Sequence, residues 1–141
     1  MKAILYDKKV LPGKLVLREV PAPIPGDNEV LIRIRAVSLN AADYRSMKMG
    51  IIPKTKIFGA DIAGVVESAG KDAVRFRPGD EVIGDLADCG FGGLAEFALA
   101  PERLLTLKPG KLSFEEAAAL PMAAQTALQA LHDKGELAAE S

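Results

Sequence analysis

The sequence predicts a mainly β domain with short helices, folded as a small, partly open barrel or sandwich with a helix at its C-terminal end. Strand-like segments recur from residue 2 to about residue 107 and are separated by turns rich in Gly and Pro, the spacing typical of small barrels and sandwiches. Beyond residue 112 the apolar residues adopt a helical spacing. The 141 residues, 49% hydrophobic and 26% charged, suffice for one domain with its own core.

The strand pattern is clearest in the first forty residues. Short apolar runs at 3–6 and 14–20 flank a turn at Pro12-Gly13, and the connector 21–26 contains three prolines that a central strand does not tolerate. Residues 29–39 alternate apolar side chains with partly charged ones. This period of two predicts a half-buried strand.

Three further strands are expected between residues 60 and 100. Residues 61–69 combine β-branched residues with glycine, and Gly64 inside this run indicates a bulge or a close approach of another backbone. A turn at 77–80 precedes a strand at 81–84, and a last strand is expected at 93–100.

The end of the chain predicts two helices. Ser113 and Glu116 form a capping-box pattern that begins a short helix over residues 114–120. Pro121 is suited to the first turn of a second helix, which we expect to run to about Lys134 and to end at Gly135. We therefore divide the chain into a β domain, residues 1–120, and an interdomain helix and linker, residues 121–141.

Charge and composition exclude several classes of protein. A formal net charge of −1 without a dense basic cluster argues against nucleic acid as a partner. Neither a signal peptide nor a run of about 18 apolar residues is present, so we expect a cytoplasmic protein without a membrane partner. The single cysteine, Cys89, cannot form an internal disulfide, and we interpret it as a partly buried side chain rather than a reactive thiol.

Several ordered motifs between residues 1 and 135 carry a resemblance to a known family. They are residues 38–45 (Ser-Leu-Asn-Ala-Ala-Asp-Tyr-Arg), 58–70 (beginning Phe-Gly-Ala-Asp-Ile-Ala-Gly-Val-Val), 77–82 (Arg-Pro-Gly-Asp-Glu-Val), 92–97 (Gly-Gly-Leu-Ala-Glu-Phe) and 121–127. Together they resemble the medium-chain dehydrogenase/reductase superfamily, in its quinone-oxidoreductase branch. The resemblance implies a GroES-like β-barrel catalytic domain, which the family follows with a Rossmann domain that binds NADP(H) or NAD(H). That Rossmann domain is absent from these residues, so its cofactor would belong to a full-length protein.

The resemblance also implies that catalysis is independent of zinc. The positions that hold the catalytic metal in the zinc-dependent branch are Asn40, Ala60 and Met122 here. A catalytic zinc needs about three ligands drawn from Cys, His, Asp and Glu, and none of these residues is one. We therefore expect no zinc, and polarisation of the substrate by hydrogen bonds instead.

Asn40 and Tyr44 are the candidate catalytic residues. The amide of Asn40 can donate to a carbonyl oxygen as negative charge develops there, and it can also hold a nicotinamide ribose; the alternative is an Asn that closes the turn after a strand. Tyr44 follows four residues later, so on a helical turn its phenol would share a face with Asn40. Its alternative is a half-buried aromatic residue, and we interpret Asp43 as a structural hydrogen-bonding partner.

Thr126 is the second candidate for cofactor binding, because the resemblance places its hydroxyl against the nicotinamide; otherwise it is a helix-packing residue. His132 is interpreted as a surface residue near a helix end. The segment 90–95 matches the G-x-G-x-x-A form of the dinucleotide fingerprint, but a strand-like segment follows it where the fingerprint requires a helix. We interpret it as a glycine-rich loop beside the active cleft.

Two functions remain open from the sequence. The first is the catalytic domain of an NAD(P)H-dependent oxidoreductase that reduces a quinone, enone, aldehyde or ketone, inactive as an isolated chain. The second is a stand-alone, non-catalytic binding or assembly module on a GroES-like scaffold. In the first case the last helix would ordinarily pack between two domains, so we expect its apolar side, including Met122, Leu128 and Leu131, to be partly uncovered and the isolated chain to form a symmetric homodimer.

Overall fold

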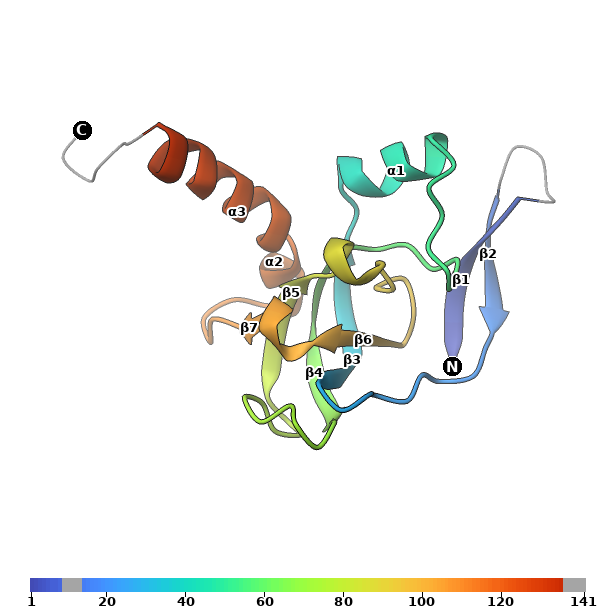
Figure 1. The fold of residues 1–141 in the computed structure, drawn as a ribbon, viewed down its shortest axis with the longest axis horizontal. Coiled ribbons are helices and arrows are strands. Elements are labelled where there is room, and N and C mark those ends of the chain that lie inside the picture. The colour runs from blue at the N-terminus through green and yellow to red at the C-terminus, as the bar shows by residue number, and fades with distance from the viewer. Residues whose placement is uncertain (9–13, 136–141) are drawn as a thin grey trace.

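The computed structural model describes residues 1–8 and 14–135, which form two antiparallel sheets (Figure 1). A hairpin pairs β1 with β2, and five strands form the second sheet in the order β6-β3-β4-β5-β7. The strands are β1 (Lys2–Asp7), β2 (Lys14–Glu19), β3 (Glu29–Ser38), β4 (Asp61–Ala69), β5 (Glu81–Asp85), β6 (Phe97–Pro101) and β7 (Leu105–Leu107). The predicted mainly β, GroES-like partly open barrel is confirmed. The expected turn at Pro12-Gly13 lies outside the described residues.

The pairing of β3 with β4 bends the five-stranded sheet. Its register shifts twice, between Leu31 and Ile32 and again between Ile34 and Ala36, and such irregularities increase the local twist of a strand pair. A Cβ atom on Gly64 would lie 2.4 Å from the carbonyl oxygen of Arg33. The predicted close approach at Gly64 is therefore confirmed, and only glycine allows β3 to pass this near.

The β1–β2 hairpin is joined to the larger sheet by the segment that precedes β6. Ala3 forms an antiparallel bridge with Ala95, and the Ile4 N–H donates to the carbonyl of Leu94 at 2.8 Å. The strand expected at 93–100 is thus shared: its first residues contact β1, and only β6 joins the main sheet.

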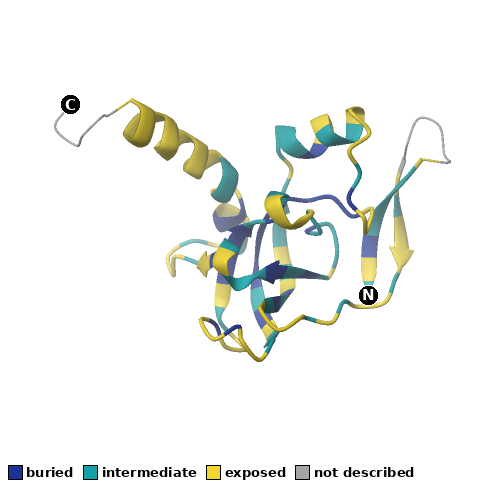
Figure 2. Ribbon diagram, in the orientation of Figure 1, coloured by how far each residue is buried: buried dark blue, intermediate teal, exposed yellow. Residues whose placement is uncertain are grey.

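The main core is built by apolar residues of the five-stranded sheet, among them Val30 and Ile32, which alternate along β3 as predicted, and Figure 2 shows buried segments along these strands. A smaller cluster on the other side of the sheet packs helix α2 (Phe114–Ala118) against Ala63 and Ile83. Among the described residues, the largest fully buried side chains are Val30, Ile32, Phe58, Asp61, Ile62, Val66, Val82 and Leu86.

The C-terminal helices begin where the sequence predicts them. The Ser113 hydroxyl accepts from the Glu116 N–H at 3.0 Å, and the Glu116 carboxylate accepts from the Ser113 N–H at 2.9 Å, so the capping box is confirmed. Helix α3 (Pro121–Leu128) continues as a π-helical segment (Gln129–Lys134) that ends at Gly135. It projects from the body on the side away from the hairpin, and most of its surface is exposed (Figures 1 and 2).

Helix α1 (Ala41–Lys48) is an addition to the predicted elements. The sequence suggested only a helical turn there, because its eight residues carry no continuous apolar stripe. Two 3₁₀ turns also occur, at Ala87–Cys89 and Glu102–Leu104.

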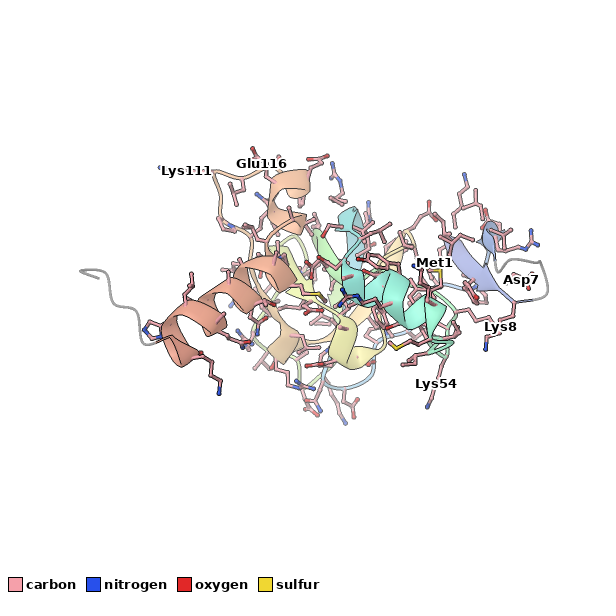
Figure 3. All side chains as sticks on the ribbon, turned by 90° about the horizontal axis from the view of Figure 1, so that it is seen from above. Met1, Asp7, Lys8, Lys54, Lys111 and Glu116 are labelled. Carbon is pink, nitrogen blue, oxygen red and sulfur yellow. The ribbon has the colours of Figure 1, made fainter. Side chains whose placement is uncertain are left out.

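Charged side chains such as Lys54 and Lys111 extend outward from the domain (Figure 3). Within residues 1–8 and 14–135 no helix has the length and apolar character needed to cross a membrane.

Candidate functional site

Four segments meet at the end of the sheet where β3 ends and β4 begins. Asn40 lies between β3 and α1, Asp43 is in the first turn of α1, Asp61 begins β4, and Met122 is in the first turn of α3. Hydrogen bonds connect these four residues, and we call them the Asn40 network. Two of the three positions that hold the metal in the zinc-dependent branch, Asn40 and Met122, thus donate hydrogen bonds to the same carboxylate, that of Asp61.

Asp43 fixes the start of α1. Its side chain is 2% exposed, and its two oxygens accept from the backbone N–H of Asn40 at 2.8 Å and of Gly59 at 2.9 Å. A buried carboxylate with two N–H donors is well compensated for its loss of water. As predicted, Asp43 is a structural hydrogen-bonding partner, and it fixes the backbone of Asn40 against the irregular segment at Gly59 that precedes β4.

Asp61 connects Asn40 to α3. Its side chain is fully buried; one oxygen accepts from the Asn40 side-chain amide at 3.0 Å, and both accept from the Met122 N–H at 3.0 and 3.2 Å. The first N–H groups of a helix have no partner inside the helix, so this contact satisfies a donor that α3 leaves open. The carboxylate therefore sets where α3 starts relative to Asn40.

Burial raises the pKa of Asp61 above the ordinary value of an aspartic acid. The hydrogen bonds from Met122 and Asn40 oppose this shift, whereas the negative charges of Asp85 and Asp43 add to it. Loss of hydration is the largest cause, and the two N–H donors compensate only part of it.

The bond to Asp61 orients the Asn40 amide. One N–H of the NH₂ group points at the carboxylate, so the amide nitrogen is assigned to that side and the second N–H remains for another acceptor. The residue is half-buried. The side chain can therefore donate one hydrogen bond from a fixed position to an acceptor, such as a carbonyl oxygen, beside it.

Tyr44 and Thr126 lie outside this network. Tyr44 is 51% exposed on α1, where the Lys48 ammonium lies 5.9 Å from its ring centroid. Thr126 is exposed on α3. Within the described residues, neither side chain hydrogen-bonds to Asn40 or Asp61, so the structure brings only Asn40 among the candidate residues into the network.

Asp61 is the residue whose role the sequence did not reveal. It belongs to the motif at residues 58–70, but its partner Met122 is 61 residues away. One signal in the sequence could have indicated this role: Asp61 is a charged residue inside the small and apolar run at residues 59–63. A carboxylate in a buried strand needs hydrogen-bond donors from elsewhere in the chain.

Other predicted features have clear positions. Segment 90–95 lies between a 3₁₀ turn and β6, so a strand and not a helix directly follows it, and it is a loop and not a dinucleotide fingerprint. His132 is on the surface and contacts Asp133 at 2.8 Å. Ala60 is fully buried, and the described part of the chain holds no group of three His, Cys, Asp or Glu residues placed to bind a metal.

The chain is similar to oxidoreductases of known family. The alcohol dehydrogenase GroES-like domain family matches residues 26–110. A chloroplast envelope quinone oxidoreductase homolog from Arabidopsis thaliana is 43% identical over 118 residues, which cover 80% of this chain and 36% of the relative. A 2-methylene-furan-3-one reductase from Solanum lycopersicum is 39% identical over 126 residues, which cover 82% of this chain and 32% of the relative.

The fold has close counterparts among solved structures. The crystal structure of a putative alcohol dehydrogenase from Sinorhizobium meliloti 1021 superposes with a TM-score of 0.84 and 32% identity, over 96% of this chain and 47% of the other. This chain thus spans about a third of the length of the curated relatives and less than half of this structural neighbour. With the family match covering most of the sheet, the chain belongs to the alcohol dehydrogenase GroES-like domain family of the medium-chain dehydrogenase/reductase superfamily.

Proposed function

We propose that this chain is the catalytic, substrate-binding domain of an NAD(P)H-dependent oxidoreductase that reduces a quinone, enone, aldehyde or ketone without zinc. The observation that carries the proposal is the Asn40 amide, which Asp61 holds in one orientation at 3.0 Å. A fixed donor stabilises developing negative charge more than a mobile one, because it needs no reorganisation during the reaction. The quinone oxidoreductase and furanone reductase names of two relatives support the substrate class.

In this proposal the residues of the network have separate tasks. Asn40 donates its second N–H to the carbonyl oxygen of the substrate, while Asp61 and Asp43 hold its side chain and backbone in place. Tyr44, half-exposed on α1, lines the substrate side of the site and is a candidate proton donor. These tasks need no metal, and the substrate oxygen is polarised by hydrogen bonding alone.

The described residues fit only the nicotinamide end of the cofactor. Asn40 and Thr126 would hold that end, through a side-chain amide and an exposed hydroxyl. The glycine-rich loop 90–95 leads directly into β6 and not into a helix, so it does not have the strand–loop–helix arrangement that binds a pyrophosphate. When bound, the cofactor supplies the hydride. We therefore propose that the 141 residues alone do not catalyse the reduction.

A chimera tests this function. Residues 1–135 would replace the matching segment of the Arabidopsis relative, so that the rest of that protein supplies the missing length. We expect NADPH-dependent reduction of a simple quinone by the chimera and none by the isolated chain. Robust turnover by the isolated 141 residues, or an inactive chimera that is folded and binds NADPH, would contradict the proposal.

Zinc content provides a separate prediction. The purified chain and the active chimera are expected to contain no stoichiometric zinc, because Asn40, Ala60 and Met122 cannot supply the ligands that a catalytic zinc needs. Elemental analysis after dialysis measures this directly. About one zinc per chain, together with loss of activity on chelation, would refute zinc-independence.

A further inference from the structure

A cavity of about 410 Å³ is lined by residues of β6, the connector that follows β2, and the glycine-rich loop. Met1, labelled in Figure 3, lines one side of it. Its volume lies within the range of about 300–1,000 Å³ that is typical of small-molecule sites. None of its lining residues belongs to the Asn40 network, so it is a separate feature of the domain.

The walls of the cavity are mainly apolar and include two aromatic rings. Phe97 and Leu99 line it from β6, and Phe91 lines it from the loop. Phe91 has a φ of 64° and lies between Gly90 and Gly92, which also have positive φ. A bulky side chain is unfavourable in this conformation, yet the Phe91 ring is held there against Phe58, at 5.5 Å between centroids. The ring is therefore a fixed wall.

The polar groups of the cavity favour a hydrogen-bond donor. Glu29 lines it, and one carboxylate oxygen is fixed by the Gly26 N–H at 2.8 Å, which leaves lone pairs of the group for a ligand. Cys89 is exposed and not partly buried as the sequence suggested, yet partial loss of hydration at its sulfur, with a further contribution from the Glu29 charge, raises the pKa of the thiol to about 11. The Cys89 thiol is therefore a neutral S–H at neutral pH.

Positive charge is scarce at this site. Among the described residues that line the cavity, no Lys or Arg occurs. The Met1 ammonium already donates to the Val20 carbonyl at 2.7 Å and lies 3.8 Å from Glu19. An anionic ligand would thus meet the Glu29 carboxylate with no Lys or Arg among the described lining residues, and Arg103, whose charge acts on Cys89, lies outside the lining.

From these observations we propose that the cavity binds a compact, uncharged aromatic molecule that carries a hydroxyl group, of the phenol class. The aromatic ring lies between the side chains of Phe91, Phe97 and Leu99, where offset or edge-to-face contacts are available. The hydroxyl donates to Glu29. This site does not depend on the proposed reduction, because no step of that reaction uses its residues.

The test is a titration of the ¹⁵N-labelled chain followed by NMR. Phenol is expected to shift the amides of Gly90, Phe91 and Gly92 in a saturable manner. Anisole, which cannot donate, should bind about 5- to 10-fold more weakly, and benzoate more weakly still. Absence of saturation, saturation at other residues only, or equal affinity for phenol and anisole would overturn the proposal.

Variants separate the cavity from the rest of the surface. Leu99→Trp places an indole in the cavity and should abolish the shifts, whereas Leu107→Trp, at a 60% exposed position on β7, should leave them unchanged. If Leu99→Trp does not fold, Val20→Phe at the cavity's connector wall is the second blocking variant. Unaltered phenol binding in a folded blocking variant would contradict the assignment.

Discussion

Asp61 is a carboxylate held in the interior by N–H donors from two distant parts of the chain. Its position explains why Asn40 has one orientation rather than several, and why α3 starts beside β4. Such a group is tolerated because each oxygen has a donor, while its burial still disfavours the charged form. The same residue thus orders the site, although burial makes its charged form less favourable in the folded chain than in the unfolded one.

The pH dependence of stability tests this description of Asp61. Because folding raises the pKa of Asp61, the folded state binds its proton more tightly, so the contribution of this group is greatest below the unfolded pKa of about 4. It is lost as the pH rises through the folded pKa. The free energy of unfolding of the wild type minus that of Asp61→Asn should therefore decrease as pH rises from about 4.

Urea unfolding at a series of pH values measures this difference. Asp88→Asn, at an exposed position, is the matched control because it removes the same charge without affecting a buried group. If the free energy of unfolding of the wild type minus that of Asp61→Asn increases over the same pH interval, the folded state favours the charged form of Asp61, and this description is wrong.

Elements with local signals were predicted from the sequence, and those that depend on distant contacts were not. Strand β3 and helix α2 were recognised from an alternating pattern and from the Ser113–Glu116 box. Helix α1 was missed because Asp43, its main anchor, bonds to Gly59, sixteen residues away. For the same reason Asn40 could be named as a candidate, whereas the carboxylate that orients it could not.

The cap of α2 allows a test at the scale of one element. Ser113→Ala removes the acceptor of the Glu116 N–H and should lower the free energy of unfolding by about 1 kcal/mol. Ser113→Thr keeps a hydroxyl and should cost little. Chemical denaturation of both variants decides the point, and an equal loss in the two would mean that the hydroxyl is not the stabilising group.

At the scale of the whole molecule, α3 and the π-helical segment that continues it are largely exposed among the described residues. Leu128 and Leu131 are 64% and 56% exposed, and Met122 is half-buried. The expected apolar exposure on this helix is thus present. Exposed apolar patches tend to be buried by association. We therefore predict that two chains form a symmetric dimer through α3.

Light scattering over a dilution series tests the dimer. The isolated chain should change from dimer to monomer on dilution, and Leu128→Gln with Leu131→Gln should be monomeric at all concentrations. The control pair is Ile24→Gln with Val74→Gln, at positions 87% and 79% exposed away from α3, which should behave like the wild type. A strictly monomeric wild type at high concentration would refute the interface.

The central claim is that Asn40 polarises the substrate in place of a metal, and the turnover number of the chimera tests it most directly. Asn40→Ala should lower kcat by roughly 10- to 1,000-fold, the effect of removing one donor to a developing oxyanion, with an unchanged fold by circular dichroism. Asn28→Ala, at an exposed position remote from the network, should leave kcat unaltered. A kcat for Asn40→Ala equal to that of the parent chimera would contradict the claim and leave Asn40 as a residue of the turn between β3 and α1.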